Sequence, residues 1–378
     1  MTESDAPNSA SKILHIKIRK SFSSIERAFM LDVEFGAAPG FVILFGPSGA
    51  GKTTLLDCVA GLAAPDEGRI SVGSRALFDL STCVNVSVEK RGVGYVLQEL
   101  ALFPHLTVEQ NIGYGLAHLS GSSSWQRSAA MLSEFGISHL RNRHPKEISG
   151  GERQRVAVAR TLVTDPSVLL LDEPLAALDV VTKSKIIDDL RRWNQTHRIP
   201  ILYVTHSREE VFALGEHVLV MERGRIIAKG TPHEVLTAPL QETVAQLAGF
   251  ENIFDATVES VHEDRGTMLC SLSDSEASAV QLETPLVRAK PGARLRVGIR
   301  AGDILLATKK PEGLSARNII AGRILSSERR DMIISIRANC GVELEVHVTL
   351  AARDSLGLAA GRDVWLVIKT HSCHLMQS

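Results

Sequence analysis

A glycine-rich run is the first part of the chain whose residue types and spacing could do chemistry. Gly46 and Gly51 precede Lys52 and Thr53 in the pattern GxxxxGK(S/T). Glycines let backbone N–H groups point inward around phosphates, and the N-terminus of a following helix adds partial positive charge. The lysine can reach β- and γ-phosphates, and the hydroxyl can ligate Mg²⁺. The pattern predicts a phosphate site made of Gly46, Pro47, Ser48, Gly49, Ala50, Gly51, Lys52, Thr53 and Thr54.

A pair of carboxylates is the second candidate. Asp172 and Glu173 directly follow the apolar run 168–171. A carboxylate at the C-terminal edge of a buried parallel strand faces the ligand crevice of an open α/β sheet. Asp172 is expected to hold Mg²⁺ through water, and Glu173 to activate an attacking water. An acidic pair at a strand end is often only a turn or a helix cap, but the phosphate loop favours the site.

The elements that must position these groups are visible as apolar runs and helical patterns. Continuous apolar runs, typical of buried parallel strands, occupy residues 41–45, 168–171, 201–204 and 218–221. Helical patterns occupy residues 52–62, 153–163 and 183–197, and residues 12–35 alternate like edge strands. Strands that alternate with helices predict an α/β fold with a parallel sheet.

The sequence pattern changes past about residue 250, where short strand patterns with turn residues replace helical periodicity. Residues 252–258 resemble 318–324, and residues 295–300 resemble 365–369. This faint repeat predicts two related β-units, OB-like barrels, with a boundary at residues 311–313.

Composition limits the class of protein. The chain has 378 residues, of which 44% are apolar and 22% charged, and a net charge of −1. These values exclude a disordered chain and argue against a dedicated nucleic-acid binder. No apolar run approaches 18 residues, and residues 1–10 are polar, so we expect neither a membrane span nor a signal segment. Five cysteines without a CxxC pair predict no disulfide framework and no zinc site.

Four further motifs carry a family resemblance. Residues 148–152 (Ile-Ser-Gly-Gly-Glu) open a helix, Gln98 follows an apolar run, residues 175–179 read Leu-Ala-Ala-Leu-Asp, and Thr205-His206 end a strand. In this order they resemble the LSGGQ signature, Q-loop, D-loop and switch histidine of ATP-binding-cassette ATPases. The signature here has Ile for Leu and Glu for Gln. The resemblance covers about residues 12–240.

The resemblance implies the roles of the matching residues. Glu173, His206 and Gln98 would be catalytic, and Thr53, Gln98 and Asp172 would hold Mg²⁺. Two copies of the chain would sandwich two ATP molecules head to tail, so that one copy's signature completes the other copy's site. The residues of this second half-site are Ser149, Gly150, Gly151, Glu152 and Asp179.

Two positions keep alternative interpretations. Ser149 and Glu152 also form the pattern of a helix capping box, and both roles can hold together. The family stacks an aromatic ring on adenine, for which Phe22 and Phe29 are candidates, and a core role is as reasonable for either ring.

Residues 98–108 are typical of importer cassettes and lead into the helical subdomain that docks on a membrane permease. Residues 89–96 are similar to molybdate-importer ATPases. Residues 314–322, with the SARN segment, and residues 368–372 resemble a molybdate-binding module. The resemblance implies an oxyanion site with Ser315, Ala316, Arg317, Lys369 and Ser372. The alternative is a structural β-hairpin that only braces the dimer. Residues 252–306 lack a SARN segment, so we do not expect that unit to bind an oxyanion in the same way.

We therefore expect an α/β P-loop ATP-binding-cassette domain over residues 1–240, with a helical subdomain at about 99–165. A C-terminal all-β domain follows at 251–378, with OB-like units at about 251–308 and 312–378. The expected function is ATP hydrolysis, with ATP and Mg²⁺, that energises molybdate import. Molybdate and tungstate are not separable from the sequence.

The expected partners are a second copy, integral-membrane permease subunits, molybdate at the C-terminal domain and, indirectly, a periplasmic solute-binding protein, with no nucleic acid. The expected place is the cytoplasmic face of the bacterial inner membrane. We also expect bound molybdate to slow transport. The competing hypotheses are an importer ATPase for sulfate, ferric iron or polyamine, a non-transport cassette protein, and a passive oxyanion-storage module.

Overall fold

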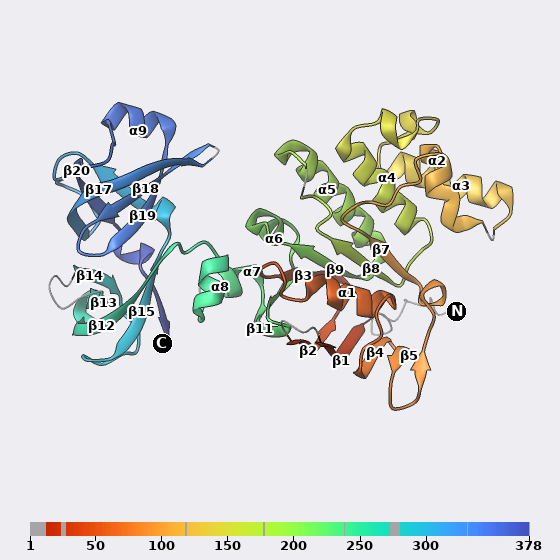
Figure 1. The fold of residues 1–378 in the computed structure, drawn as a ribbon, viewed down its shortest axis with the longest axis horizontal. Helices are drawn as coiled ribbons and strands as arrows, with labels where there is room; N and C mark the ends of the chain where they lie inside the picture. Colours follow the sequence, from red (N-terminus) through yellow and green to blue (C-terminus); the bar gives the residue numbers. More distant parts are fainter. Residues whose placement is uncertain are drawn as a thin grey trace, which may run out of the picture. The chain divides into compact units, whose positions relative to one another are not determined.

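The fold is taken from a computed structural model of the full chain. It describes residues 13–23, 28–117, 119–176, 178–237, 239–272, 280–330 and 332–377. The predictions for residues 1–10 and for Ala177 of the D-loop lie outside these ranges. The chain divides into two compact units, residues 1–233 and 234–378, which we call the N-terminal and C-terminal units and describe one at a time (Figure 1).

A six-stranded sheet in the order β11-β10-β3-β9-β8-β7 is the centre of the N-terminal unit. All neighbours pair in parallel except β10 and β11. The four predicted apolar runs lie in β3, β8, β9 and β10, and β3, β8 and β9 are buried at every residue. The strands are β3 Gly40–Phe45, β7 Val93–Val96, β8 Val168–Asp172, β9 Pro200–Thr205, β10 His217–Glu222 and β11 Arg225–Gly230.

A second, antiparallel sheet in the order β2-β1-β4-β5-β6 belongs to the same unit. Its apolar face shares one core with the parallel sheet and with α1. The predicted edge strands at 12–35 are β1 and β2. The strands are β1 Leu14–Ser23, β2 Ala28–Ala37, β4 Glu67–Val72, β5 Arg75–Asp79 and β6 Val84–Asn85.

The helices of this unit follow the loops that leave the parallel sheet. The three predicted helices are α1, α4 and α5, and the last two begin three residues earlier than their helical patterns. Helices α2, α3 and α4 gather on one side of the unit (Figure 1). The helices are α1 Lys52–Ala60, α2 Val108–Gly113, α3 Gly121–Glu134, α4 Gly150–Leu162, α5 Val180–His197 and α6 Arg208–Leu214. Within the described ranges, no helix has the length and apolar character to cross a membrane.

The C-terminal unit contains two five-stranded sheets, β14-β13-β12-β15-β21 and β16-β20-β17-β18-β19. Short helices α7 Pro232–Leu236 and α8 Glu242–Leu247 precede them, and α9 Leu350–Leu356 interrupts the β-rich region. The strands are β12 Asn252–His262, β13 Thr267–Leu272, β14 Val280–Pro285, β15 Arg294–Ile299, β16 Ile304–Ala307, β17 Asn318–Arg330, β18 Ile333–Asn339, β19 Glu343–Thr349, β20 Asp363–Ile368 and β21 His374–Gln377.

The repeat seen in the sequence is a structural repeat with exchanged strands. Strand β12 pairs with β15 through Asn252↔Ile299, and β17 pairs with β20 through Asn318↔Ile368. Each long strand has a register shift at the same place, before Ser260 and before Ser326. The last strand of each repeat joins the sheet of the other repeat: β16 pairs with β20, and β21 with β15.

Two asparagines hold the repeats together reciprocally. Asn252 accepts a hydrogen bond from Glu345 N (2.7 Å) and donates one to Glu345 O (2.9 Å). Asn318 makes the same pair with Glu283 N (2.7 Å) and Glu283 O (2.9 Å). Both asparagines are buried. Each one supplies hydrogen-bond partners to the backbone of an edge strand in the other repeat, β19 for Asn252 and β14 for Asn318.

Candidate functional sites

The phosphate loop connects β3 to α1. Gly46 has φ +156°, and a Cβ there would lie 2.2 Å from the carbonyl oxygen of Met221. Gly51 has φ +97°, and a Cβ there would lie 2.7 Å from the ring of Phe29. Both positions therefore require glycine, and the loop is confined to a path that presents its backbone to a ligand.

Lys52, the first residue of α1, is only 7% exposed. Its Nζ donates hydrogen bonds to the carbonyl oxygens of Gly46 and Pro47, each at 2.9 Å. Burial lowers the pKa of Lys52, and the charges of Glu173 and Asp172 oppose that shift. The ammonium is thus held against the loop and close to both predicted carboxylates.

Asp172 is the last residue of β8 and is 6% exposed. Burial raises the pKa of Asp172, and the hydrogen bond that the Thr53 hydroxyl donates to it acts in the opposite direction. A hydroxyl and a carboxylate therefore meet beside the phosphate loop. Oxygen ligands of this kind, completed by substrate phosphates, are those that Mg²⁺ prefers, so the residues fit the metal that the resemblance implies.

Tyr95 in β7 is a residue of this site to which the sequence assigned no role. Its hydroxyl donates to Asp57 of α1 at 3.3 Å. Burial, followed by the charges of Asp172 and Asp57, raises the pKa of Tyr95 far above its usual range. The hydroxyl thus remains a neutral donor between two carboxylates. The tyrosine in the segment that leads to Gln98 was the signal available in the sequence.

Glu173 and His206 come together from adjacent strand ends. Glu173 follows β8 with φ +46°, and its N–H donates to Val204 O of β9 at 3.1 Å. A left-handed backbone is unfavourable for a non-glycine residue, and such outliers cluster at functional sites. His206 Nδ1 lies 3.4 Å from Glu173 Oε1, and the His206 side chain is 66% exposed. The structure therefore pairs the predicted general base with the predicted switch histidine.

Glu210 in α6 organises the turn that contains His206. It is buried and accepts hydrogen bonds from Thr205 Oγ1 (2.7 Å) and the Tyr203 hydroxyl (2.9 Å). It also forms an ion pair with Lys183 of α5 at 3.1 Å. The β9 end and the α5 helix are thus fixed to one carboxylate. Nothing in the sequence distinguishes Glu210, because a glutamate in a short helix is an ordinary surface residue until the fold buries it.

Gln98 lies in the exposed turn after β7, beside the strand that ends in Asp172. The segment after it is held from α4: Arg160 donates to the carbonyl oxygens of Leu100 (2.9 Å) and Ala101 (2.7 Å). Both of these residues have positive φ. Arg160 therefore fixes a strained segment that connects the sheet to the helical region.

The signature residues form the helix cap that the sequence predicted. Glu152 N donates to Ser149 Oγ at 3.3 Å, and Ser149 N donates to Glu152 Oε2 at 2.7 Å. The hydrogen bond from the Ser149 backbone is the main reason that the pKa of Glu152 is lowered. The negative charge of Glu152 is thus bound by Ser149, at the N-terminus of its own helix. A Cβ on Gly151 would lie 2.3 Å from Thr182 Cγ2, so that glycine permits the close approach of α4 and α5.

Asp179 of the D-loop caps α5, where it accepts a hydrogen bond from Thr182 N at 3.0 Å. The two adenine candidates differ. Phe29 packs partly buried against the core beside Gly51, whereas Phe22 is 42% exposed with Lys20 Nζ 5.0 Å from its ring centre. Phe22 is therefore the more exposed of the two rings, with Lys20 over one of its faces.

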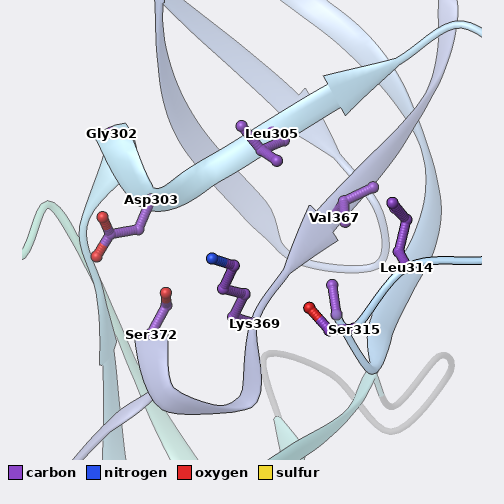
Figure 2. A pocket seen from close by; sticks show the side chains of 9 residues that line it. Gly302, Asp303, Leu305, Leu314, Ser315, Val367, Lys369 and Ser372 are labelled. Atoms are coloured by element: carbon purple, nitrogen blue, oxygen red, sulfur yellow. The ribbon is translucent and has the colours of Figure 1, made fainter.

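The C-terminal unit has an open pocket of about 280 Å³ at the repeat junction. Its lining comes from the turn before β16, the loop before β17 and the turn after β20. Lys369 lies between Ser372 and Ser315, with its ammonium on the side of Ser372 and Asp303 (Figure 2). The lining residues are Gly302, Asp303, Leu305, Leu314, Ser315, Ala316, Val367, Lys369 and Ser372.

Four of the five predicted oxyanion residues line this pocket, and Arg317 does not. Its Nε lies 3.9 Å from Glu283 Oε1, and its side chain is 64% exposed. Asp303, which no motif in the sequence marks, adds a carboxylate to the lining. The structure thus gives the pocket one cation, Lys369, with two hydroxyls.

Comparison with known proteins gives consistent matches. The family model described as ABC transporter matches residues 31–176, and the TOBE domain model matches residues 314–375. The molybdenum import ATP-binding protein ModC of Rhizobium meliloti is 39% identical over 345 residues, which cover 91% of this chain and 95% of the relative. The molybdate/tungstate import ATP-binding protein WtpC of Pyrococcus abyssi is 38% identical and covers 87% and 90%.

Among solved structures, the chain is similar to a dimeric ATP-binding cassette in a post-hydrolysis state bound to ADP and Pi. The identity is 27% and the TM-score 0.51, and the match covers 58% of this chain and 98% of that one. The match thus spans a complete cassette and leaves the remainder of this chain unmatched.

Proposed function

Because the chain belongs to the ATP-binding proteins of ABC transporters, among the molybdenum import members, we propose that it hydrolyses ATP to energise molybdate import through a membrane permease. One observation supports this most: the phosphate loop, Asp172-Glu173 and His206 follow the neighbouring strands β3, β8 and β9. The carboxyl ends of these parallel strands form one edge of the sheet. The chain would act as a peripheral protein on the cytoplasmic face of the membrane.

The chemistry follows from the residues at that edge. Glu173 takes the proton of a water molecule as its oxygen attacks the γ-phosphorus, and the bond to the bridging oxygen of ADP breaks. Lys52 offsets the charge that develops on the γ-phosphate, and His206 beside Glu173 contacts that phosphate. Mg²⁺, when bound at Thr53 and Asp172, would neutralise charge on the β- and γ-phosphates.

The signature helix supplies the second half of each site. Helix α4 has 13 residues, and its first turn contains two glycines, Gly150 and Gly151. Its N–H groups and helix dipole suit the γ-phosphate of an ATP held by another copy. Asp179 lies at the start of the neighbouring helix. The proposed active form is therefore a homodimer with two sandwiched ATP molecules.

The helical region α2–α4 is the proposed contact with the permease. Tyr114 and Trp125 are more than half exposed there, and Phe103 lies 4.3 Å from Tyr114 between ring centres. Asn111 is fully buried and fixes the loop through the carbonyl oxygens of Phe103, Leu106 and Thr107. Exposed aromatic rings on helical segments beside a fixed loop are suited to a protein interface.

The pocket of the C-terminal unit is the proposed oxyanion site. Lys369 offers charge, and Ser315 and Ser372 offer hydroxyl donors, which together suit a tetrahedral dianion such as molybdate or tungstate. We expect the bound oxyanion to slow ATP hydrolysis, since the ligand of this pocket is the product of transport. Such coupling requires that the oxyanion prefer one state of the dimer.

The test is reconstitution of the chain with its permease in vesicles, with uptake of molybdate, sulfate, ferric iron and a polyamine measured alongside ATP hydrolysis. Molybdate uptake that requires ATP supports the proposal. Uptake of another solute would transfer the assignment to that importer, and hydrolysis without uptake of any of them would contradict it.

Regulation is tested separately, by the ATPase rate across a molybdate titration in wild type and Lys369→Ala. A rate that falls with molybdate only in the wild type is expected. A flat rate in both proteins would remove the regulatory role.

A further inference from the structure

The structural repeat assigns every position of the open pocket an equivalent on the other repeat. The pairs Asn252↔Ile299 and Asn318↔Ile368 align β12 with β17 and β15 with β20. The exchanged strands follow the same rule, because Leu305 pairs with Val367 and His374 pairs with Gly298. Ala316, Val367, Lys369 and Leu305 of the open pocket therefore correspond to Phe250, Gly298, Arg300 and His374.

The side chain of Phe250 fills that equivalent position. It is only 4% exposed. Its Cδ1 would lie 3.1 Å from a Cβ on Gly298, its ring lies 4.3 Å from the Arg300 guanidinium, and its centre is 5.3 Å from that of the His374 ring. Three residues equivalent to pocket-lining residues thus contact one phenyl ring, where the open pocket has only the methyl group of Ala316.

The sizes of the residues are exchanged between the two positions. The open pocket combines Val367 with Ala316, whereas the filled one combines Gly298 with Phe250. A side chain at Gly298 would collide with the ring and with Met376 Cε at 2.9 Å. The missing side chain at Gly298 therefore makes the room that Phe250 occupies.

Arg300, the cation at the filled position, and its neighbour His374 also form hydrogen bonds with residues that precede β12. Arg300 Nη2 donates to Leu236 O at 3.1 Å, and His374 Nε2 donates to Pro239 O at 3.0 Å. The Nε of Arg300 is buried without a hydrogen-bond partner in the described part of the chain, against the face of Phe250. A ring face is favourable for a guanidinium in such a place.

We propose that the C-terminal unit contains two equivalent anion-pocket positions, and that the chain's own connecting segment, residues 234–250, occupies one of them, with Phe250 in the place of the ligand. Each chain then binds one oxyanion, at Lys369, and the closed position anchors the connecting segment instead. The stoichiometry rests on the oxyanion site proposed above, whereas the anchoring does not.

The first test is the number of molybdate ions bound per full-length chain, measured by equilibrium dialysis. Wild type is expected to bind one. Phe250→Ala gives the closed position the alanine of the open pocket and is expected to bind a second. A further Arg300→Ala change should remove that second ion. Phe254→Ala, which removes a ring from β12 four residues after Phe250, should stay at one.

The mirror variant Ala316→Phe/Val367→Gly installs the ring and the glycine in the open pocket. It is expected to weaken molybdate binding by at least 100-fold. Two ions bound by wild type, no gain in Phe250→Ala, or undiminished binding in the mirror variant would each overturn the closed-site assignment.

The second test, amide hydrogen exchange of residues 236–250, needs no oxyanion. Phe250→Ala and Arg300→Ala are expected to raise the exchange rate there at least tenfold, and Lys369→Ala to leave it unchanged. Absence of molybdate binding by wild type would refute the oxyanion site of the proposed function, while faster exchange would still support the anchoring. Unchanged exchange in both variants would overturn the anchoring of the connecting segment.

Discussion

The ATP site and the open pocket of the C-terminal unit both place a lysine beside small polar residues, yet they use the charge differently. Lys52 is 7% exposed, is held by two loop carbonyl oxygens and has a pKa lowered by burial. Lys369 is exposed at the edge of an open pocket. A charge in a low-dielectric site interacts strongly with a transition state, whereas one in water interacts weakly. The first arrangement suits catalysis and the second suits reversible sensing.

The two sites also differ in how the chain assembles them. The phosphate loop is one continuous segment, and its carboxylates end the buried strand β8. The open pocket needs three separated segments, at residues 302–305, 314–316 and 367–372, and strand β16 supplied by the other repeat. A site made by local backbone tolerates little change in sequence, whereas a site at a repeat junction can be opened or filled by single side chains. Phe250 and Ala316 illustrate that freedom.

Glu173→Gln gives the largest expected effect. Loss of the proposed general base should lower ATP hydrolysis by about 10²- to 10⁴-fold and leave ATP binding intact. Single-turnover hydrolysis and nucleotide binding by fluorescence separate the two quantities. Normal hydrolysis by this variant would show that the β8 edge is not where water is activated.

Glu210→Ala should lower the free energy of unfolding by about 3 kcal/mol, because the buried Tyr203 and Thr205 and the partly buried Lys183 lose their acceptor. Urea unfolding measures this, and Glu209→Ala, an exposed neighbour, should change it by less than about 0.5 kcal/mol. Equal effects of the two changes would mean that the buried network does not support the proposed catalytic edge.

Lys369→Ala should weaken molybdate binding by about 10- to 100-fold, the value of one charge-assisted hydrogen bond. Basal ATP hydrolysis should not change. Asp303→Asn should act in the opposite direction and tighten binding, since it removes a negative charge from the lining. Arg317→Ala, which faces Glu283, should change binding by less than about threefold. Calorimetric titration distinguishes these cases, and a dominant effect of Arg317 would move the site away from the pocket.

Asp172→Asn should give the smallest effect, a rise of about 2 °C in the Tm of the nucleotide-free chain at pH 7. Burial raises the pKa of Asp172, so the folded state binds its proton more tightly than the unfolded state does. The wild type therefore loses stability as pH rises from the unfolded pKa, about 3.9, through the raised folded pKa. The Tm difference should disappear below about pH 3.5, and a difference that persists there would contradict this cause.

Much of the N-terminal unit could be predicted because its signals are local. The apolar runs that became β3, β8, β9 and β10 are buried on both faces, and such strands lack the alternation of exposed ones. The cap formed by Ser149 and Glu152 depends on residues three positions apart. Glu210 and Tyr95 could not be assigned in this way, because their partners lie on other elements and only burial makes them distinctive.

The C-terminal unit shows where the sequence stops being sufficient. The repeat and four pocket residues were visible in it, but the orientation of Arg317 toward Glu283 was not. Strand exchange, which sets β16 beside β20 and β21 beside β15, also left no mark in the spacing of residues.

The sequence by itself determined the phosphate loop, the position of the proposed catalytic pair and the two repeats, because backbone conformation, capping and strand burial follow from nearby residues. Only the tertiary structure decided that Lys369 lines an open pocket while the equivalent Arg300 is covered by Phe250. That outcome depends on which side chains, distant along the chain, compete for the same volume, and close packing allows only one of them to occupy it.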